Sequence, residues 1–469
     1  RKKNYFFTCM KFNELLQKRY SAVFIAPDGI ENVHEYASRR RQFLSRVKMP
    51  VVLSGVLREP GTEEEFYSTW CRLVQDPAFL YFTGVNQPGC YLWLDPNASN
   101  AEREILFLPQ KDSFLEFWNG VRLGVGAPQD EAEACALTGF QKVLDAKDFP
   151  AFVKKKLQEM DGPELGMIYS PEFLEDHHYK FFSEVSIWCE QYQKKIENVT
   201  ELHFQDRFIL SQLQIRDLKR ATKYTGNAFK TCLSCLKTFK TEQDLGLRLN
   251  YEMLKQSNSD LAFPTIVASG KNACCLHYVK NDEILEQGNL VLLDFGVRSG
   301  TVCSDISRTI PVSGKFSPLQ KLIYSVVLET QEFHESQVAP GKDLLDLDAK
   351  AWEFLNQKLE EVLKKHNGSF KLLYDKRPHG ISHFIGEEVH EGGLLPKKNR
   401  FHYCLQPGML ISNEPGVYGS FKAEIEGIVY EEILGIRIED DLLVTEDGCV
   451  NISTEIPKKI EDLEEILQT

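Results

Sequence analysis

The feature that most constrains this 469-residue chain is a pair of short apolar runs, each carrying an aspartate, that are joined by a turn. Residues 290–296 read Leu-Val-Leu-Leu-Asp-Phe-Gly, residues 301–306 read Thr-Val-Cys-Ser-Asp-Ile, and Val-Arg-Ser-Gly lies between them. If Ser299 and Gly300 are the central turn residues, cross-strand partners have numbers that sum to 599, so Asp294 lies opposite Asp305. Their Cβ atoms would then be about 4.5 to 5.5 Å apart. Two carboxylates so close repel each other unless a proton or a cation lies between them.

A second group of candidates is the histidine-rich stretch of residues 378–390. It contains His379, His383 and His390, at spacings of four and seven residues. Within a helix such spacings would place the side chains on one face, but Gly380 and Gly386 favour a loop with broken secondary structure. Histidine is the commonest metal ligand and a frequent proton carrier. The stretch therefore predicts imidazoles for one or both of these tasks.

Two glutamates complete the candidate donors. Glu414 ends an apolar run and immediately precedes a Pro-Gly pair, which predicts a carboxylate at the end of a strand beside a turn. Residues 435–439 alternate apolar and charged, so Arg437 and Glu439 are expected on the face opposite the core. Four carboxylates with one or more imidazoles make an oxygen-rich site, which suits Mn²⁺ and tolerates Co²⁺, Fe²⁺ or Zn²⁺.

Short blocks in the same order and spacing make the chain resemble the metal-dependent aminopeptidase P and prolidase family. The blocks lie at residues 263–273, 276–278, 304–309, 314–317, 379–383, 389–390, 414–418 and 435–440, together with Asp294. The resemblance implies an α+β fold, with a pita-bread catalytic domain at residues 201–469 preceded by an α/β domain of the aminopeptidase P type at residues 1–200. Residues 75–84 and 118–124 resemble that first domain, which in the family shapes the substrate entrance and the subunit contacts.

The same resemblance implies a role for each candidate residue. Two divalent metal ions, expected to be Mn²⁺, would be held by Asp294, Asp305, His383, Glu414 and Glu439, with Asp305 and Glu439 bridging both ions. Glu414 would also carry a proton to the leaving nitrogen. The catalytic set would be completed by His277, His379 and His390, which contact the substrate, and by Arg437, which orients carboxylates.

Three functions remain open at this stage. The first is an aminopeptidase that removes the N-terminal residue when proline is second, and the second is a prolidase restricted to Xaa-Pro dipeptides. The third is a pita-bread protein that binds peptides without catalysis, which the presence of all five ligand positions disfavours. Residues 305–309 and 277–281 favour the aminopeptidase, and residues 88–91 also resemble prolidases.

Composition restricts the partners and the compartment. A net charge of -13 and a pI near 5.5 disfavour nucleic acid and anionic membranes as partners. The sequence contains no apolar run of about 18 residues, and residues 1–5 do not resemble the apolar core of a signal peptide. We therefore expect a cytoplasmic homo-oligomer, a dimer or a tetramer, that acts on proline-containing peptides and keeps its cysteines reduced.

Overall fold

A computed structural model of the chain describes residues 29–56, 75–170, 176–255, 259–375, 377–393, 395 and 403–468. Its contacts divide the chain into two compact units, Arg1–Arg207 with Leu394–Pro396, and Phe208–Gly393 with Lys397–Thr469. The first unit extends to Arg207 because helix α9 (Thr200–Arg207) packs against helix α2 (Gly29–Arg46).

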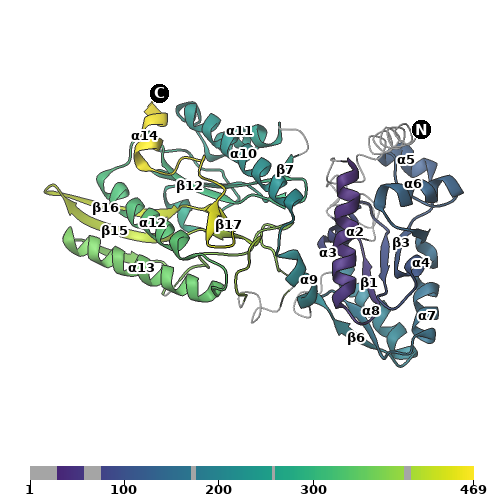
Figure 1. The fold of residues 1–469 in the computed structure, drawn as a ribbon. Coiled ribbons are helices and arrows are strands. Elements are labelled where there is room, and N and C mark those ends of the chain that lie inside the picture. Colours follow the sequence, from purple (N-terminus) through teal and green to yellow (C-terminus); the bar gives the residue numbers. More distant parts are fainter. Residues whose placement is uncertain are drawn as a thin grey trace, which may run out of the picture. The chain divides into compact units, whose positions relative to one another are not determined.

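The first unit is a six-stranded sheet with helices on both faces (Figure 1). The strand order is β4-β3-β2-β1-β5-β6, and β2 runs antiparallel to its neighbours β1 and β3, whereas the outer pairs are parallel. The strands are β1 (Val51–Ser54), β2 (Tyr91–Leu94), β3 (Glu104–Leu108), β4 (Lys142–Asp145), β5 (Glu164–Met167) and β6 (Lys195–Asn198). The helices after α2 are α3 (Pro77–Thr83), α4 (Asn100–Arg103), α5 (Ser113–Asn119), α6 (Pro128–Thr138), α7 (Phe149–Glu159) and α8 (Asp176–Gln191).

Strand β1 shows why both faces of this sheet are covered. Its side chains alternate between the faces, so Val51 and Leu53 enter one apolar core while Val52 enters the other. Residues of α2, α3 and α6 line the first core, and residues of α7 and α8 line the second. The α/β character predicted for the first half is therefore confirmed.

The second unit combines long helices with four small three-stranded sheets around one large apolar core. Its helices are α10 (Gln212–Ser234), α11 (Glu242–Leu254), α12 (Pro318–Gln337), α13 (Leu344–Lys365) and α14 (Ile460–Gln468). Its sheets have the orders β11-β10-β7, β12-β9-β8, β13-β15-β16 and β14-β17-β18. The strands are β7 (Ser259–Leu261), β8 (Ile266–Ser269), β9 (Leu290–Phe295), β10 (Val297–Ser299), β11 (Val302–Cys303), β12 (Ile306–Pro311), β13 (Ser369–Leu372), β14 (Leu410–Asn413), β15 (Gly416–Ile425), β16 (Ile428–Arg437), β17 (Asp440–Val444) and β18 (Cys449–Asn451).

The hairpin that carries the two aspartates has a different register from the predicted one. Ser299 pairs with Val302, so partner numbers sum to 601 and the central turn residues are Gly300 and Thr301. Gly300 has a φ of 62°, a left-handed conformation that glycine adopts without steric cost, and this fixes where the turn begins. Asp294 consequently lies opposite Ser307 rather than Asp305. The predicted direct pairing of the aspartates was therefore wrong by two residues.

The register error leaves the two aspartates on the same side of the sheet. Side chains alternate along a strand with a period of two, so a shift of two residues keeps the face and makes Asp305 a diagonal neighbour of Asp294. Asp305 lies in the short break between β11 and β12. The break frees its backbone from regular pairing, and its N–H donates to the buried carboxylate of Asp441 at 3.2 Å.

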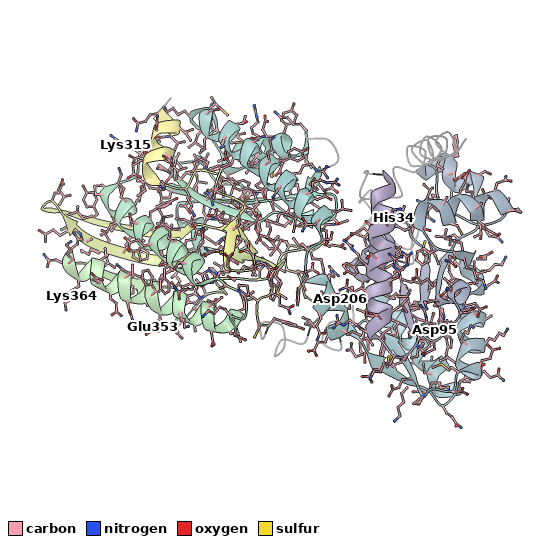
Figure 2. The ribbon with its side chains drawn as sticks, in the orientation of Figure 1. His34, Asp95, Asp206, Lys315, Glu353 and Lys364 are labelled. Atoms are coloured by element: carbon pink, nitrogen blue, oxygen red, sulfur yellow. The ribbon has the colours of Figure 1, made fainter. Side chains whose placement is uncertain are left out.

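Helices α12 and α13 pack against each other beside the strands that carry the remaining candidates. Each helix begins with a defined cap: Ser317 and Gln320 form a capping box on α12, and the carboxylate of Asp343 accepts two backbone N–H groups of α13. The outer face of α13 is polar, and Glu353 and Lys364 point away from the core (Figure 2). The inner face of α12 buries several polar residues, among them Thr330, Gln331 and His334.

Two negative findings apply to the part of the chain that the structure describes. None of its helices has the length and apolar composition needed to cross a membrane. None of the ten cysteines in this part forms a disulfide.

Candidate metal centre

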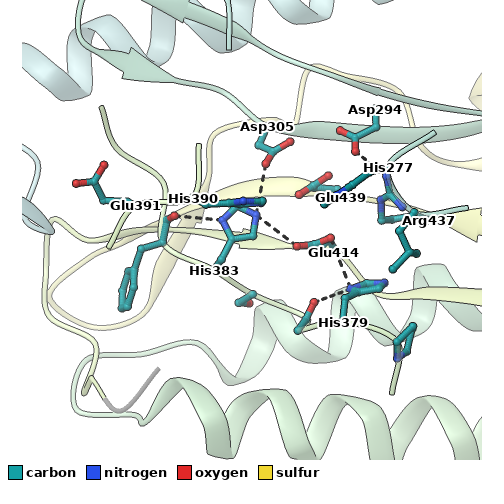
Figure 3. Close-up of a pocket in the computed structure, with 15 residues that line it drawn as sticks. His277, Asp294, Asp305, His379, His383, His390, Glu391, Glu414, Arg437 and Glu439 are labelled. Carbon is teal, nitrogen blue, oxygen red and sulfur yellow. Dashed lines mark hydrogen bonds and ion pairs between the residues drawn. The ribbon is translucent and has the colours of Figure 1, made fainter. Parts of the chain in front are cut away.

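One cavity of about 390 Å³ in the second unit brings all the predicted site residues together (Figure 3). It is lined by the nine residues singled out from the sequence, namely His277, Asp294, Asp305, His379, His383, His390, Glu414, Arg437 and Glu439. Six more residues complete the lining, namely Leu276, Pro378, Gly380, Ser382, Phe384 and Glu391. The nine predicted residues come from segments up to 162 positions apart, so only the fold makes them neighbours.

Each candidate ligand is placed by a different short segment. Asp294 belongs to β9, Glu414 directly follows β14, and Glu439 lies between β16 and β17. His383 lies in a loop that is attached to β14, because its backbone N–H donates to Ser412 Oγ and its carbonyl accepts from Ser412 N, both at 2.9 Å. The sequence expectation of a loop in the histidine-rich stretch is confirmed.

The donor atoms converge closely enough to share a cation. Ligand atoms of Asp305, His383 and Glu439 all lie within 4.8 Å of one another. His383 Nε2 is 3.4 Å from Asp305 Oδ2 and 3.4 Å from Glu414 Oε1. His383 Nδ1 lies 3.1 Å from the carbonyl of Phe384, which can only accept, so Nδ1 carries the proton and Nε2 presents a lone pair to the cavity.

Asp294 supplies an acceptor that the described protein atoms leave unused. Its Oδ1 is buried and makes no hydrogen bond within the described part of the chain. Its Oδ2 accepts from Arg437 Nη2 at 2.6 Å. A buried carboxylate oxygen without a donor is unfavourable, and a cation at Oδ1 would satisfy it.

The buried carboxylates raise one another's affinity for protons. Burial is the largest cause that raises the pKa of Asp305, Glu414 and Glu439 well above the ordinary range, and repulsion between neighbouring carboxylates adds to it. Burial also lowers the pKa of His383, which favours the neutral, metal-binding form of its ring. Buried acceptors with an excess of negative charge form a donor set that fits divalent cations.

Arg437 connects the carboxylates to the surrounding hydrogen bonds. Its Nε donates to Ser307 Oγ at 2.8 Å, and that hydroxyl donates to Glu439 Oε2 at 2.7 Å. Its Nη1 donates to the hydroxyl of Tyr418 at 3.2 Å. Burial lowers the pKa of Arg437, but Tyr418 and the carboxylates, with Asp294 first among them, more than offset this and raise its pKa well above the ordinary value.

His379 and the other imidazoles line the same cavity as the carboxylates. His379 Nδ1 contacts the carbonyl of Gly380 at 2.7 Å and so carries a proton, which leaves Nε2 to accept from the hydroxyl of Tyr418 at 3.0 Å. Burial, then the charge of Arg437, lowers the pKa of His379 to about 3. The ring of His390 lies 4.5 Å from that of His383 and 6.4 Å from that of His277, measured between ring centroids.

Sequence reasoning missed several residues that support the site. Ser307 faces Asp294 only in the observed register, so the predicted register gave it no role. Glu391 lines the cavity, and Asp441 accepts the N–H of Asp305. The signal for Ser412 was its place two residues before Glu414, which puts both on the same side of β14.

Comparison with known proteins agrees with this geometry. Residues 216–446 match the profile of metallopeptidase family M24, and residues 36–164 match the profile of the aminopeptidase P N-terminal domain. Haemophilus influenzae Xaa-Pro aminopeptidase is 32% identical over 404 residues, which cover 84% of this chain and 88% of that protein. This chain belongs to the M24 metallopeptidases of the aminopeptidase P type. The human protein Xaa-Pro aminopeptidase 3 is 31% identical over 404 residues, covering 84% of this chain and 76% of that protein.

Solved structures place the fold in the same family. Escherichia coli aminopeptidase P with the inhibitor Pro-Leu superposes with a TM-score of 0.75 at 25% identity, covering 93% of this chain and 98% of that one. Icp55 from Saccharomyces cerevisiae superposes with a TM-score of 0.75 at 25% identity, covering 93% of this chain and 97% of that one. The predicted pita-bread domain and its preceding domain are therefore confirmed, and the chain is a metal-dependent aminopeptidase of this family.

Proposed function

We propose that this enzyme removes the N-terminal residue from peptides whose second residue is proline, and that it uses two divalent cations to do so. The observation that carries the proposal is the convergence of four carboxylates and His383 on a single cavity. Support for the substrate comes from relatives named Xaa-Pro aminopeptidase and from the Escherichia coli structure with Pro-Leu as inhibitor.

Two cations fit the distribution of donors better than one. Asp305 and Glu439 lie centrally, with Asp294 on one side and His383 with Glu414 on the other (Figure 3). We assign Asp294 to one ion, His383 and Glu414 to the second, and Asp305 and Glu439 to both. The oxygen-rich set favours Mn²⁺, with Co²⁺, Fe²⁺ or Zn²⁺ as alternatives. When bound, such a pair supplies a deprotonated water at neutral pH and polarises the scissile carbonyl.

Glu414 is placed to move the proton. Its carboxylate is partly buried, with Oε1 3.4 Å from His383 Nε2 and Oε2 3.7 Å from His379 Nδ1. Burial raises the pKa of this carboxyl well above its ordinary value, and repulsion from Glu439 adds to the effect. A carboxyl whose pKa is raised in this way can accept a proton and return it to the leaving proline nitrogen.

The remaining predicted residues bind and orient the substrate. His277, His379 and His390 line the cavity and present imidazoles from two stretches of the chain, so we assign them hydrogen bonds to the peptide backbone of the substrate. Arg437 holds Asp294 and Glu439 in place, the former directly and the latter through Ser307. Leu276, Pro378 and Phe384 provide apolar wall that would contact the proline ring.

The length of the substrate separates this proposal from its alternatives. A prolidase would be restricted to Xaa-Pro dipeptides. The relative from Saccharomyces cerevisiae named intermediate cleaving peptidase 55, 28% identical over 449 residues, suggests a longer polypeptide as the substrate. A non-catalytic binding protein is disfavoured because all five ligand positions converge. The cytoplasmic location and the dimeric or tetrameric state stay predictions.

A peptide panel tests the proposal. The Mn²⁺-loaded chain is assayed on an Xaa-Pro dipeptide, an Xaa-Pro-Yaa tripeptide, a longer Xaa-Pro peptide and a matched Xaa-Ala-Yaa tripeptide. We expect release of Xaa from the tripeptide and the longer peptide, and little cleavage of the alanine control. Cleavage of the dipeptide alone would establish a prolidase, and equal rates on proline and alanine peptides would contradict the proposal.

A further inference from the structure

The amide of Gln331 contacts two backbone carbonyls that adjoin two candidate metal ligands. Gln331 lies on α12 and is fully buried. Its Nε2 donates to the carbonyl of Asn413 at 3.2 Å and to the carbonyl of Ile438 at 3.1 Å. These residues directly precede Glu414 and Glu439 in the sequence. One side chain thus bridges the two segments that present the glutamates.

Holding these carbonyls restricts the glutamates that follow them. The carbonyl of one residue and the N–H and Cα of the next lie in one rigid peptide plane. The other side of each plane is also held, because Glu414 N donates to the carbonyl of Ile381 at 2.9 Å and Glu439 N donates to the carbonyl of Ser307 at 3.0 Å. The peptide group before each glutamate is therefore hydrogen-bonded through both its carbonyl and its N–H, which fixes the position of the glutamate Cα.

The orientation of the Gln331 amide is itself fixed. Lys458 Nζ donates to Gln331 Oε1 at 2.7 Å, which turns the two N–H groups toward the carbonyls. The same ammonium donates to Asp440 Oδ2 at 2.6 Å. A return bond runs from Asn413 Nδ2 to the backbone carbonyl of Gln331 at 2.9 Å. Since an amide supplies two donors and one acceptor, it meets a demand that no single hydroxyl or carboxylate could meet.

We propose that Gln331 is a positioning residue that sets the distance between Glu414 and Glu439 and thereby tunes the affinity of the site for its second cation. Gln331 lines no part of the cavity and contacts neither glutamate side chain, so it acts through the backbone. The inference rests on the proposed dinuclear site. The buried face of α12 would thus contribute to metal binding without lining the cavity.

Metal titration of two matched variants tests this role. Gln331→Met keeps an unbranched side chain of similar length but removes both donors and the acceptor. Thr330→Val is the control, because Thr330 is equally buried on the same helix and its hydroxyl bonds only the carbonyl of Val326, at 2.8 Å. Mn²⁺ binding to the metal-free full-length chains is measured by calorimetry, and thermal unfolding is measured in EDTA.

We expect Gln331→Met to weaken binding of the second Mn²⁺ by about 10- to 100-fold, as loss of a group that orients metal ligands commonly does. At saturating Mn²⁺ its kcat should recover while KM stays near that of the wild type. Both variants should lose stability in EDTA, whereas Thr330→Val should bind Mn²⁺ like the wild type. A Gln331→Met chain with unchanged Mn²⁺ affinity would overturn the proposal.

Lys458→Met provides a second variant, because Lys458 is nearer the surface than Gln331 and its loss frees the amide to rotate. Lys458→Met should also weaken Mn²⁺ binding, by a smaller factor than Gln331→Met. If Gln331→Met does not fold, an unchanged Mn²⁺ affinity in Lys458→Met would contradict the proposal. A wild-type chain that binds no divalent cation would instead reject the proposed dinuclear site. The two failures are therefore distinguishable.

Discussion

Neighbouring carboxylates in the second unit, Asp440 on one side and Asp305, Glu414 and Glu439 on the other, have pKa values that are shifted in opposite directions. Burial alone raises the pKa of Asp440, but Arg308 and Lys458 more than offset this, so the pKa of Asp440 lies below its ordinary value. Asp305, Glu414 and Glu439 have Arg437 as a nearby cation, and their pKa values are raised well above the ordinary range. The direction of the pKa shift thus depends on the number of cations that the protein itself places beside each carboxylate.

Asp440 belongs to a structural ion pair, whereas Asp305, Glu414 and Glu439 belong to a ligand site. Asp440 has its charge balanced by side chains, with Arg308 Nη2 at 2.7 Å and Lys458 Nζ at 2.6 Å. Glu439 directly precedes Asp440 in the sequence but faces a cavity lined by further carboxylates. The cavity carboxylates lack the neighbouring cations that balance the charge of Asp440. This difference indicates that a bound ligand supplies their positive charge.

Removing a carboxylate from the site should have the largest effect. We predict that Asp305→Asn abolishes peptidase activity, because it removes the carboxylate that we assign to both cations. In metal-free buffer the same variant should be more stable than the wild type, because it relieves repulsion between buried charges. Peptide hydrolysis and urea unfolding in EDTA measure the two effects. Asp447→Asn, in an exposed turn, is the matched control and should change neither.

Removing a cation from Asp440 should lower the stability of the protein, the opposite of the effect expected for Asp305→Asn. Arg308→Met leaves the charge of Asp440 buried with fewer partners, which costs about 3 to 5 kcal/mol of the free energy of unfolding. Lys422→Met breaks an exposed pair with Glu431 and should cost about 1 kcal/mol or less. Urea denaturation measures both. Equal losses in the two variants would show that the Asp440 pair is not the structural element described here.

Removing a hydrogen bond within the ligand site should have an intermediate effect. Ser307→Ala removes the hydroxyl that connects Arg437 to Glu439. We expect activity or metal affinity to fall about 10- to 100-fold. The variant should still bind the cation when the Mn²⁺ concentration is high. Titration of activity with Mn²⁺ measures this, with Ser336→Ala, an exposed serine on α12, as the control. Full activity at low Mn²⁺ would contradict the role given to Ser307.

The smallest predicted effect is the dependence of stability on pH, and bound metal should abolish it. Asp305, Glu414 and Glu439 have raised pKa values in the folded state, so their contribution is fully present below the unfolded pKa of about 4 to 4.5 and is lost as pH rises through the folded values. For Asp440 the folded pKa is lowered, so its contribution is lost as pH falls. Without metal, Tm should therefore decline on going from mildly acidic to neutral pH. Saturating Mn²⁺ should remove the decline, and an identical Tm profile with and without Mn²⁺ would contradict this.

The sequence allowed the site to be predicted more completely than the strand register. The two aspartates were placed on one face although the turn was misplaced by one residue, because the resulting two-residue shift in pairing preserves the alternation of side chains. The actual turn depended on Gly300 taking a φ of 62° close to Asp217, a contact with a helix more than eighty residues earlier. Such tertiary contacts leave no local pattern in the sequence.

The supporting residues were harder to predict than the ligands. Ligand types are restricted by metal chemistry, so acidic and imidazole side chains beside apolar strands were recognisable. Gln331 has no such restriction: it lies 82 residues before Asn413 and 107 before Ile438, and nothing in residues 318–337 distinguishes it from a glutamine on a helix surface. Only the packing of α12 beneath the site reveals its function.

The most direct test is the metal stoichiometry of the purified full-length chain. After removal of metal and titration with Mn²⁺, calorimetry combined with elemental analysis should give two bound ions for each wild-type chain and fewer for Glu439→Gln, with activity appearing only as the ions bind. A wild-type chain that binds no Mn²⁺, or a Glu439→Gln chain that binds as many ions as the wild type, would contradict the assignment of these carboxylates to a dinuclear centre.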